Sequence, residues 1–393
     1  MGFPHLDRRS LLKYASVSGL ASLATACLSQ NAPTTATATG SPGVGAPSAS
    51  AVQQQQTITW KIQSGWAGND IFQQLFLDWK GLVEEMSGGR LKIDALPVNA
   101  VTNINGAIDA VHSGTLDGAH HVPAYYYGKD HAVSLMGTGP MMGMSGQMWL
   151  AWYYYGGGQA LFEKLVQQKL KLNVVSLYHM PMQNQPLGWF KQPITAASDF
   201  QGVKFRTVGL ATGIYQFMGA TVVSVAGAEV ASALDRGVVD AAEFNNTTSD
   251  KVYGLPDVRK ICMTQSYHQP SEILVIDLNK TKYDAMPKDL QAIMKYAAWA
   301  ESANGEWKFF DLNSKDYADL VGKGIQFIVA PDSVKDAQMN AWKKTIADES
   351  ASNPDFAAII ASQRQWAQRI FPWASTVNLA IPDVRSYNAL AKA

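Results

Sequence analysis

The sequence predicts an α/β protein made of two similar lobes, and three observations support this fold class. Short apolar segments alternate with amphipathic helical segments from Thr57 onward, an order typical of a parallel sheet with helices on both faces. One helix–glycine–strand pattern occurs twice, about 120 residues apart. The chain has 393 residues, 47% of them hydrophobic, which is enough for two domains of ordinary size.

The first four elements each have a local signal. Residues 57–65 (TITWKIQSG) and 90–97 (RLKIDALP) are strand-like, whereas 69–89 and 103–114 have the apolar spacing of helices. Glycines close both helical segments, as expected where a helix ends in the left-handed conformation. The β-α-β-α order favours a parallel arrangement of these strands.

The repeated pattern lies at residues 107–120 (AIDAVHSGTLDGAH) and 230–243 (VASALDRGVVDAAE). Each copy has an apolar helical stripe, a glycine, an apolar residue followed by aspartate, and then small residues. Chance similarity between two common units is the alternative explanation. If the repeat is real, His120 and Glu243 occupy equivalent strand ends, and two facing lobes form a cleft at such ends.

The second lobe begins near Met182, and later segments cross back to the first. The sequence predicts a strand ending at Arg206, a strand at 271–277 that returns to the first lobe, a long helix at 287–324 and a final amphipathic helix at 356–373. Crossing strands and a long helix would act as a hinge. The predicted division is lobe I at 57–181 with about 273–310, lobe II at 182–272 with about 325–360, and a C-terminal helix and tail at 361–393.

The N-terminal residues 1–27 have the features of an export signal. Arg8 and Arg9 precede a modestly apolar stretch, as in a twin-arginine signal, with an ordinary secretory signal as the alternative. Cys27 follows small residues and is a candidate lipid anchor, although plain cleavage after Ala26 would also fit. Residues 28–56 are rich in Thr, Ala, Ser, Pro, Gly and Gln, a composition typical of a flexible linker.

Composition excludes several classes of protein. Lys+Arg and Asp+Glu both number 32, so nothing in the net charge favours nucleic acid or an anionic membrane surface. Cys262 is the one cysteine after residue 27, so the body has no internal disulfide. No stretch beyond the signal has the roughly 18 uninterrupted apolar residues of a membrane helix.

Several segments resemble the solute-binding subunits of tripartite ATP-independent periplasmic (TRAP) transporters. They are WFKQPITAASDFQGVKFRTVG, AEVASALDRGVVDAAE and PKDLQAI, while AHHVPAYYYGKDHAV and WAQRIFPWASTVNLA resemble the branch that binds 2-oxo acids. The resemblance implies a periplasmic-binding-protein-like fold, with a mixed sheet in each lobe and a long helix spanning both. It also implies an extracytoplasmic protein that captures a small organic acid and delivers it to a membrane permease, without catalysis or a catalytic cofactor.

The resemblance also assigns a ligand site. Arg206 matches the arginine that pairs with the substrate carboxylate, and a guanidinium suits this role because it forms two parallel hydrogen bonds. A surface ion pair is the alternative role. Gln185, Glu243, the Phe244 carbonyl and Gln269 match the residues around a cation beside the ligand, and Gln185 also contacts the substrate.

Two of these positions depart from the family pattern. Phe244 replaces a tryptophan, which matters little if its carbonyl is the ligand, and Gln269 replaces a glutamate, which leaves one formal charge. Glu243 would then oppose a carboxylate unless a cation lies between them, a cation such as Arg206 pairs with it, or it is protonated. All-oxygen ligands suit Na⁺ or Ca²⁺, the single carboxylate favours a monovalent ion, and a metal-free site is the alternative. Glu272 could compensate, but its direction is open.

Two further expectations concern Tyr126 and the C-terminus. Tyr126, within AYYYGK, is the candidate hydroxyl donor to the ligand from the first lobe, with simple packing as the alternative. Asn245 and Asn246 would cap a turn or contact ligand. The C-terminal helix resembles one that exchanges between subunits, which implies a homodimer, with a monomer as the alternative.

Enzyme classes are the main rivals of this interpretation. A twin-arginine signal often serves cofactor enzymes, so a periplasmic oxidoreductase is one alternative, yet no cofactor fingerprint is present. His120, His121 and His131 lie close in sequence without the spacing of a zinc protease. A scaffold lipoprotein would leave Arg206 and Glu243 unexplained. Dicarboxylates and sugar acids remain alternative ligands of the same fold.

Overall fold

In the computed structural model, residues 57–377 are described, and all of them belong to the second of the chain's two units, Gln55–Ala393. The predicted export segment 1–27, its candidate anchor Cys27, the linker 28–56 and the last part of the C-terminal tail lie outside the described residues. Among the described residues, no helix is both long and apolar enough to span a membrane.

The first sheet forms the base of lobe I and has the order β2-β1-β3-β10-β4. Its strands β1, β2 and β3 are parallel, whereas β10 is antiparallel to both of its neighbours. The sheet is therefore mixed, because β10 enters it from the second lobe. The strands are β1 (Ile58–Ser64), β2 (Leu91–Leu96), β3 (Gly118–His121), β4 (Val174–Pro181) and β10 (Ile273–Asn279).

The second sheet forms the base of lobe II and has the order β11-β9-β5-β8-β6-β7. Here β6 is parallel to β7 and β8, and β5 is antiparallel to β8 and β9. The strands are β5 (Gly188–Phe190), β6 (Lys204–Arg206), β7 (Thr221–Val223), β8 (Ala241–Ala242), β9 (Ile261–Thr264) and β11 (Gln326–Val329). The α/β fold with two mixed sheets is the class that the sequence predicts.

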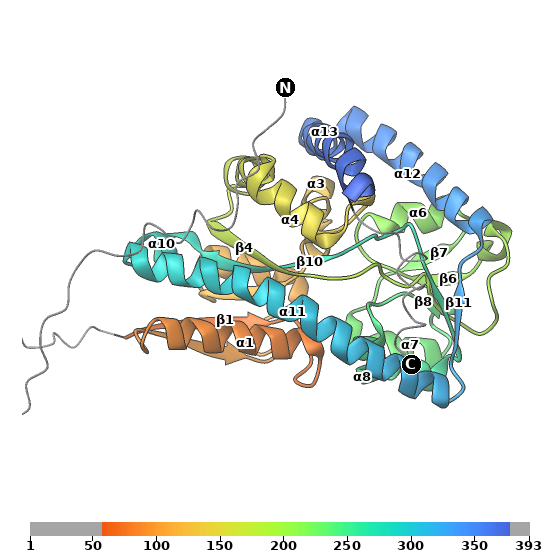
Figure 1. Cartoon of the computed structure of the whole chain (residues 1–393), viewed down its shortest axis with the longest axis horizontal. Helices are drawn as coiled ribbons and strands as arrows, with labels where there is room; N and C mark the ends of the chain where they lie inside the picture. Colours follow the sequence, from red (N-terminus) through yellow and green to blue (C-terminus); the bar gives the residue numbers. More distant parts are fainter. Residues whose placement is uncertain (1–56, 378–393) are drawn as a thin grey trace, which may run out of the picture. The chain divides into compact units, whose positions relative to one another are not determined.

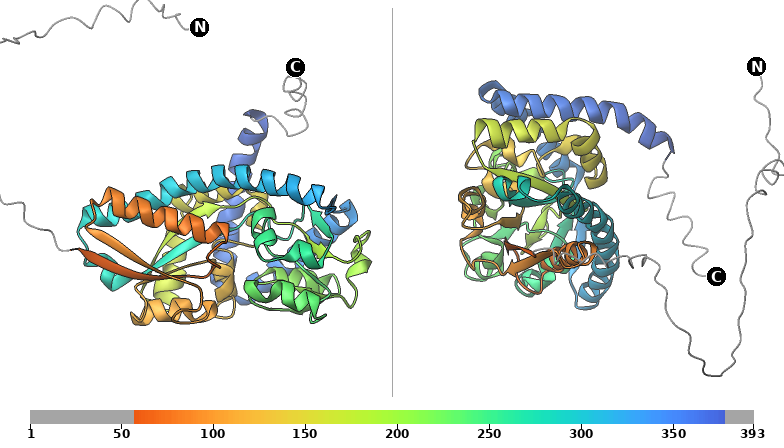
Figure 2. Two further views of the ribbon diagram at one scale, coloured as in Figure 1. Left: turned by 90° about the horizontal axis from the view of Figure 1, so that it is seen from below. Right: turned by 90° about the vertical axis from the view of Figure 1, so that its left-hand side faces the viewer.

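One long helix, α11 (Lys288–Gly322), runs past both lobes, as Figure 1 shows. It packs against α1 (Ile71–Met86) and β4 in lobe I, and against α8 (Thr247–Val252) in lobe II. Figure 2 shows α1 and α11 lying side by side over part of their length. Pro287 precedes the helix, which suits the start of a helix because proline lacks the N–H that would have no partner there.

The remaining helices cover the faces of the sheets and the C-terminal region. Two of them, α12 and α13, follow β11, and α12 was not distinguished in the sequence. The α-helices are α2 (Ala107–Ser113), α3 (His131–Ser134), α4 (Gly146–Tyr155), α5 (Gly158–Glu163), α6 (Ala211–Phe217), α7 (Val230–Asp235), α9 (Leu255–Val258), α10 (Lys280–Asp284), α12 (Asp332–Ser352) and α13 (Pro354–Val377). Shorter 3-10 and π turns are η2 (Ile104–Gly106), η3 (Pro123–Tyr126), η4 (Met141–Gly143), η5 (Lys164–Lys169), η6 (Ala197–Phe200) and η7 (Gly227–Glu229).

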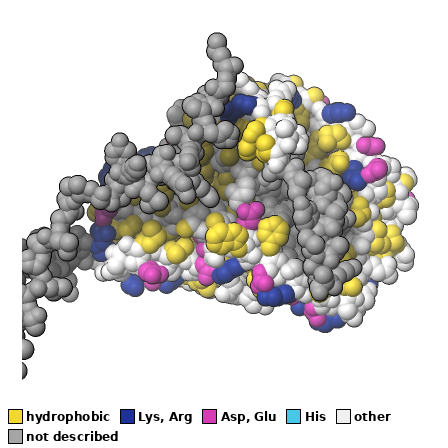
Figure 3. All heavy atoms as spheres, viewed as in Figure 1, with side chains coloured by type: hydrophobic (Ala, Val, Ile, Leu, Met, Phe, Trp, Pro, Cys, Tyr) yellow, Lys and Arg dark blue, Asp and Glu magenta, His cyan; other side chains and the backbone are white. Residues whose placement is uncertain are grey.

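Lobe I and lobe II each have an apolar cluster of their own, and a third, larger cluster contains residues of both, such as Val275 and Phe205. In lobe I, Trp60, Phe76 and Trp79 pack with the apolar side chains of β10 and α11. In lobe II, Trp189, Leu234 and the free cysteine Cys262 pack together beneath β8. On the face seen in Figure 3, acidic and basic side chains are interspersed, in agreement with the zero net charge of the chain.

Candidate functional site

The candidate site begins where β6 and β8 end side by side. The two strands are parallel, Arg206 is paired in register with Ala242, and the Glu243 backbone N–H donates to Arg206 O at 3.2 Å. Buried small residues, Ala241 and Ala242, allow β8 to lie deep in the lobe. Because parallel strands end at the same edge of a sheet, Arg206 and Glu243 emerge together at that edge.

Arg206 and Glu243 form a buried ion pair. Arg206 Nη1 lies 3.0 Å from Glu243 Oε1 and donates to the Glu243 carbonyl oxygen at 3.1 Å, and both side chains are only 2% exposed. Nε donates to the Val225 carbonyl oxygen at 3.2 Å, and the guanidinium lies over the Phe244 ring. The hydrogen bonds among the described residues thus hold Arg206 through Nε and Nη1, and they leave Nη2 for a ligand.

The electrostatics of Glu243 reflect two opposing effects. Burial raises the pKa of the Glu243 carboxyl, while the neighbouring Arg206 guanidinium acts to lower it. The sequence left three states of Glu243 open, and the structure shows the one in which Glu243 pairs with Arg206. A buried pair of this kind needs both partners, because removal of one leaves an uncompensated charge.

Gln185 links the end of β8 to a buried polar network. Its Nε2 donates to the Phe244 carbonyl oxygen, and its Oε1 lies 2.9 Å from His268 Nε2. His268 Nδ1 lies 2.5 Å from Ser266 Oγ, and burial lowers the pKa of His268 to about 3, so the imidazole is neutral. The predicted residues Gln185 and Phe244 are therefore in contact, and the same Gln185 amide also contacts His268.

Glu272 supplies a second acid that the sequence left undecided. It lies just before β10, is 4% exposed and takes part in the charge interactions of Glu243 and Arg206. Burial, followed by the nearby Glu243, raises the pKa of Glu272 to about 8, although Arg206 and a hydrogen bond with Gln269 act in the opposite direction. Gln269 is itself buried, and its carbonyl oxygen accepts from Gln185 N at 3.2 Å.

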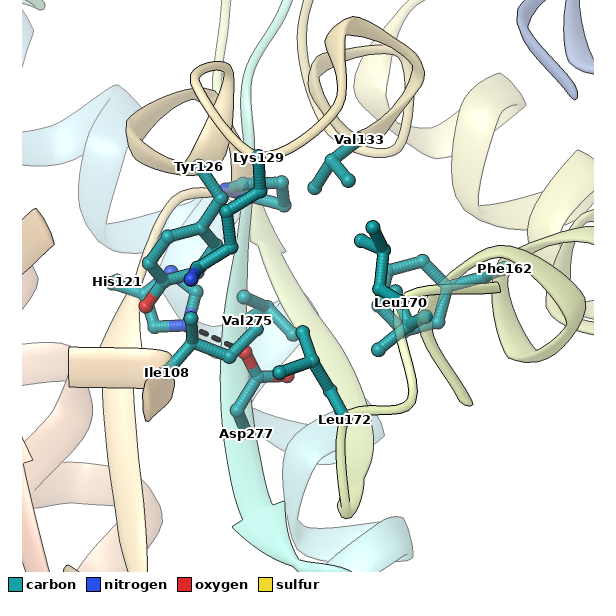
Figure 4. A pocket seen from close by; sticks show the side chains of 12 residues that line it. Ile108, His121, Tyr126, Lys129, Val133, Phe162, Leu170, Leu172, Val275 and Asp277 are labelled. Atoms are coloured by element: carbon teal, nitrogen blue, oxygen red, sulfur yellow. Dashed lines mark hydrogen bonds and ion pairs between the residues drawn. The ribbon is translucent and has the colours of Figure 1, made fainter. Parts of the chain in front are cut away.

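The structure brings Tyr125, rather than the predicted Tyr126, to these charges. Burial raises the pKa of Tyr125, and its charged neighbours are Arg206, Glu272 and Glu243. Tyr126 points the other way, because its ring packs edge-on against His121 with the centroids 4.5 Å apart. Figure 4 shows Tyr126 beside this histidine in a small pocket of lobe I. Adjacent tyrosines in a turn face different sides, and the sequence carries no signal that distinguishes them.

The two asparagines after Phe244 have structural partners. Asn246 is the N-cap of α8, because its side chain accepts from Ser249 N at 3.0 Å. Asn245 N donates to Asp250 Oδ1 at 3.0 Å, and its side-chain oxygen accepts from Asn246 Nδ2 at 2.6 Å. Of the two roles expected for these asparagines, capping and ligand contact, these hydrogen bonds correspond to capping.

The histidines that raised the hydrolase alternative do not converge. His120 Nδ1 lies 3.3 Å from Ser64 Oγ, His121 Nε2 lies 2.7 Å from Asp277 Oδ2, and His131 Nδ1 lies 2.8 Å from Glu349 Oε1. Each therefore has a separate partner. Across residues 57–377, no group of three or more His, Cys, Asp or Glu side chains is arranged to hold a metal ion.

Known proteins similar to this chain are solute-binding proteins. A monocarboxylate 2-oxoacid-binding periplasmic protein of Nostoc sp. is 26% identical over 304 residues, which cover 77% of this chain and 82% of that protein. A TRAP solute-binding protein of Colwellia psychrerythraea, with bound calcium and pyruvate, has 27% identity and a TM-score of 0.77 over 85% of this chain and 99% of its own.

A second solved structure, from Pseudoalteromonas atlantica, has bound sodium and pyruvate. It shows 26% identity and a TM-score of 0.77 over 82% of this chain and 97% of its own. The family model for bacterial extracellular solute-binding proteins, family 7, matches residues 63–352. That match spans most of the chain and all the site residues described above. The chain belongs to family 7 of the bacterial extracellular solute-binding proteins, which bind solutes and are not enzymes.

Proposed function

We propose that this protein captures a small organic acid, a 2-oxo acid or related monocarboxylate, together with a cation, and delivers it to the membrane permease of a TRAP transporter. One observation carries the proposal: Arg206 is buried and held in place by Glu243 and the Val225 carbonyl, with Nη2 left over. A fixed guanidinium with unused N–H groups is well suited to bind a carboxylate.

The cation would be held by oxygen atoms that surround the same edge of β8. The donors are the carboxylates of Glu243 and Glu272, the Phe244 carbonyl and the side-chain oxygens of Gln185 and Gln269. Hard ions such as Na⁺ and Ca²⁺ prefer such a set. This set contains only two acidic side chains, so it agrees with the lack, across residues 57–377, of any group of three or more His, Cys, Asp or Glu side chains arranged to hold a metal ion.

Gln185 must change its orientation to join this set. Its Nε2 now faces Phe244 O, and its Oε1 faces His268 Nε2. A half-turn of the amide would exchange these atoms and direct Oε1 beside the Phe244 carbonyl, while Nε2 would donate to His268. Neutral His268 permits both states, since either ring nitrogen can carry its proton. The residues therefore fit a cation after a rotation that exchanges the Gln185 hydrogen bond to the Phe244 carbonyl for one to His268 and leaves the backbone in place.

Charge balance favours a divalent ion when both glutamates are ionised. Arg206, Glu243 and Glu272 then sum to one negative charge, and a bound monocarboxylate makes two. A Ca²⁺ ion neutralises the group, whereas Na⁺ does so only if Glu272 keeps its proton. When it is ionised, Glu272 offsets the loss of charge at Gln269, where the family pattern has a glutamate. The similar proteins with pyruvate and either calcium or sodium support both forms of this proposal.

The proposal extends to export, anchoring and assembly. Arg8-Arg9 supports export by the twin-arginine route, and Cys27 supports attachment to a membrane surface through a lipid, with residues 28–56 as the tether. Tyr126 was the predicted hydroxyl donor, and we replace it in this role by Tyr125, whose neighbours are the charged residues of the site. A homodimer through the C-terminal helix completes the proposed assembly.

Calorimetric titration tests the ligand. Pyruvate, longer 2-oxo acids, lactate and C4-dicarboxylates are titrated into the protein in buffers with and without Na⁺ and Ca²⁺. We expect monocarboxylates to bind and removal of both cations to weaken them. Arg206→Ala should abolish binding, and Lys191→Ala, which changes an exposed cation elsewhere in lobe II, should have no effect. Equal binding by Arg206→Ala and the wild type would refute the proposal. Tighter binding of dicarboxylates than of monocarboxylates would change the proposed class of ligand.

A further inference from the structure

A buried hydrogen bond joins the two lobes beside the candidate site. Asp70 belongs to lobe I, where it is the N-cap of α1, and Ser249 lies on α8 between β8 and β9 of lobe II. Ser249 Oγ donates to Asp70 Oδ2 at 2.9 Å, and both residues are fully buried. The other oxygen, Oδ1, accepts from Phe72 N at 2.9 Å within lobe I. One carboxylate therefore caps a helix and contacts the opposite lobe at the same time.

A second contact crosses the lobes one turn further along α8. The backbone N–H of Ala67, in lobe I, donates to the hydroxyl oxygen of Tyr253 at 3.2 Å. The Tyr253 ring packs edge-on against Phe244, with the ring centroids 4.8 Å apart. Phe244 in turn offers its carbonyl oxygen to Gln185. Tyr253 thus connects the loop before α1 to the edge of the site itself.

These contacts differ from the rest of the site because they depend on the approach of the lobes. The bond from Phe72 N to Asp70 lies within one lobe and survives any separation of the two. The bonds Ser249–Asp70 and Ala67–Tyr253 are lost when the lobes separate, and their groups then hydrogen-bond to water. Neither pair includes a residue that we assign to the carboxylate or the cation.

We infer that Asp70, Ser249, Ala67 N and Tyr253 form a lobe latch, which sets how fast the closed protein releases its ligand. The inference rests on the proposed capture of an organic acid between the lobes. A hydrogen bond that forms only in the closed state stabilises the closed state, relative to the open state, by its whole free energy. Loss of the latch therefore speeds opening, while ligand capture by Arg206 in the open state is unchanged.

Dissociation kinetics with pyruvate, in buffer containing Ca²⁺, provide the first test. Ser249→Ala removes the donor to Asp70 without disturbing the cap of α1, and Tyr253→Phe removes the acceptor of Ala67 N. Ser249→Ala should raise the dissociation rate about tenfold, because a hydrogen bond to a buried carboxylate is stronger than the average one. Tyr253→Phe should raise it by about threefold, because its bond joins two neutral groups, and both variants should change the association rate less than about twofold. Ser302→Ala is the matched control, since that buried hydroxyl donates to Ala298 O within α11.

Hydrogen exchange at the backbone of residues 65–70 provides a test that needs no ligand. Ala67 N–H is protected by Tyr253 only while the lobes are together, so Tyr253→Phe and Ser249→Ala should speed its exchange, and Ser302→Ala should not. Unchanged exchange and unchanged dissociation in both latch variants would overturn the inference. If pyruvate fails to bind but exchange at Ala67 responds as expected, the latch holds and the proposed ligand is wrong.

Discussion

The ends of β3 and β8 occupy the same place in two lobes of the same topology, yet they do different things. In lobe I, β3 has parallel β1 on one side and antiparallel β10 on the other. In lobe II, β8 has parallel β6 on one side and antiparallel β5 on the other. The helices before them, α2 and α7, are followed by Gly114 and Gly237, and each strand begins four residues after its glycine.

This correspondence pairs Gln63 with Arg206 and His120 with Glu243. Gln63 is in register with Ala119 on β3, as Arg206 is with Ala242 on β8. The Gln63 amide is saturated within its own lobe: Oε1 accepts from Val101 N at 2.7 Å, and Nε2 donates to Thr102 O at 2.7 Å.

His120 is equally turned inward. Burial lowers the pKa of His120 well below its usual value, so the ring is neutral, and it stacks on Phe76 at 5.0 Å. One lobe therefore ends its central strands in neutral groups that stabilise the lobe, and the other ends them in the ion pair that we propose as part of the ligand site. The two edges are equivalent in topology, and they differ in the chemistry of their side chains.

Removal of Arg206 should produce the largest difference between the two edges. Arg206→Ala leaves Glu243 buried without its partner, so we expect the free energy of unfolding to fall by about 3–5 kcal/mol and pyruvate binding to be lost. Gln63→Ala should cost about 1 kcal/mol, because it deprives the partly exposed N–H groups of Val101 and Thr102 of an acceptor, but leave affinity nearly unchanged. Urea unfolding and calorimetry measure both. Equal losses of affinity would contradict the assignment of roles.

The helices that follow the equivalent strands β1 and β6 also differ between the lobes, and the pH dependence of stability should reveal the difference. Asp70 caps α1, whereas α6 has no side-chain cap. Burial raises the pKa of Asp70 from 3.8 to about 6, so the unfolded chain loses this proton first and stability falls as pH rises through about 6. A rise of about two pKa units corresponds to about 3 kcal/mol.

Asp70→Asn keeps the capping oxygen and removes the titration. Urea unfolding at pH of about 4.5 and about 7.5 should show a smaller decline for this variant than for the wild type. An identical pH dependence of the two proteins would show that Asp70 does not titrate in this range.

The second carboxylate should decide how strongly the lobe II edge binds a cation. Glu272→Gln removes one charge from the oxygen set, so we expect Ca²⁺ affinity to fall about tenfold or more, since ligand charge sets the affinity of such sites. The added change Gln269→Glu should restore it. The Ca²⁺-dependent rise in Tm is the measurement, and Glu163→Gln, an exposed acid of α5, is the control. An undiminished rise in Glu272→Gln would remove Glu272 from the site.

Substitution of the adjacent residues Tyr125 and Tyr126 should distinguish a contact with the ligand from a contact within the core of lobe I. Tyr125→Phe should weaken pyruvate binding by up to about tenfold through the loss of one hydrogen bond, and Tyr126→Phe should leave binding unchanged. Calorimetry under identical conditions compares the two variants. A reversed result would restore Tyr126 as the ligand donor.

The paired glycines should show the smallest and most equal effects. Gly114 has φ 80° and Gly237 has φ 72°, conformations that disfavour any side chain. Gly114→Ala and Gly237→Ala should each lower the free energy of unfolding by about 1 kcal/mol. Unequal costs in urea unfolding would mean that the two units are less alike than their backbone geometry indicates.

Much of the fold was predictable because its signals are local. The strands and helices of 57–114 follow from alternating and helical apolar patterns, and Pro287 correctly marks the start of α11. Helices such as α12 were harder to distinguish. Its buried residues Val334, Gln338, Ala341 and Trp342 do lie on one helical stripe, but one of them is polar and four are few for a helix of 21 residues.

The site was predictable in part, because family resemblance identifies positions but not directions. It assigned Arg206, Gln185, Glu243, Phe244 and Gln269, and the structure groups these with Glu272. The sequence could not single out Glu272 or Tyr125 as site residues. Both lie in short irregular segments, where the direction of the side chain changes from one residue to the next.

Local patterns and composition were thus sufficient for the α/β class, the repeated helix–glycine–strand units and the zero net charge, since each depends on neighbouring residues or on a simple sum. Other features depend on contacts between residues that are distant in sequence. Arg206 and Glu243 are 37 positions apart, Arg206 and Glu272 are 66 positions apart, and Asp70 and Ser249 are 179 positions apart. Such contacts exist only after the strands are ordered in their sheets, because packing, and not local preference, brings these groups into one buried volume.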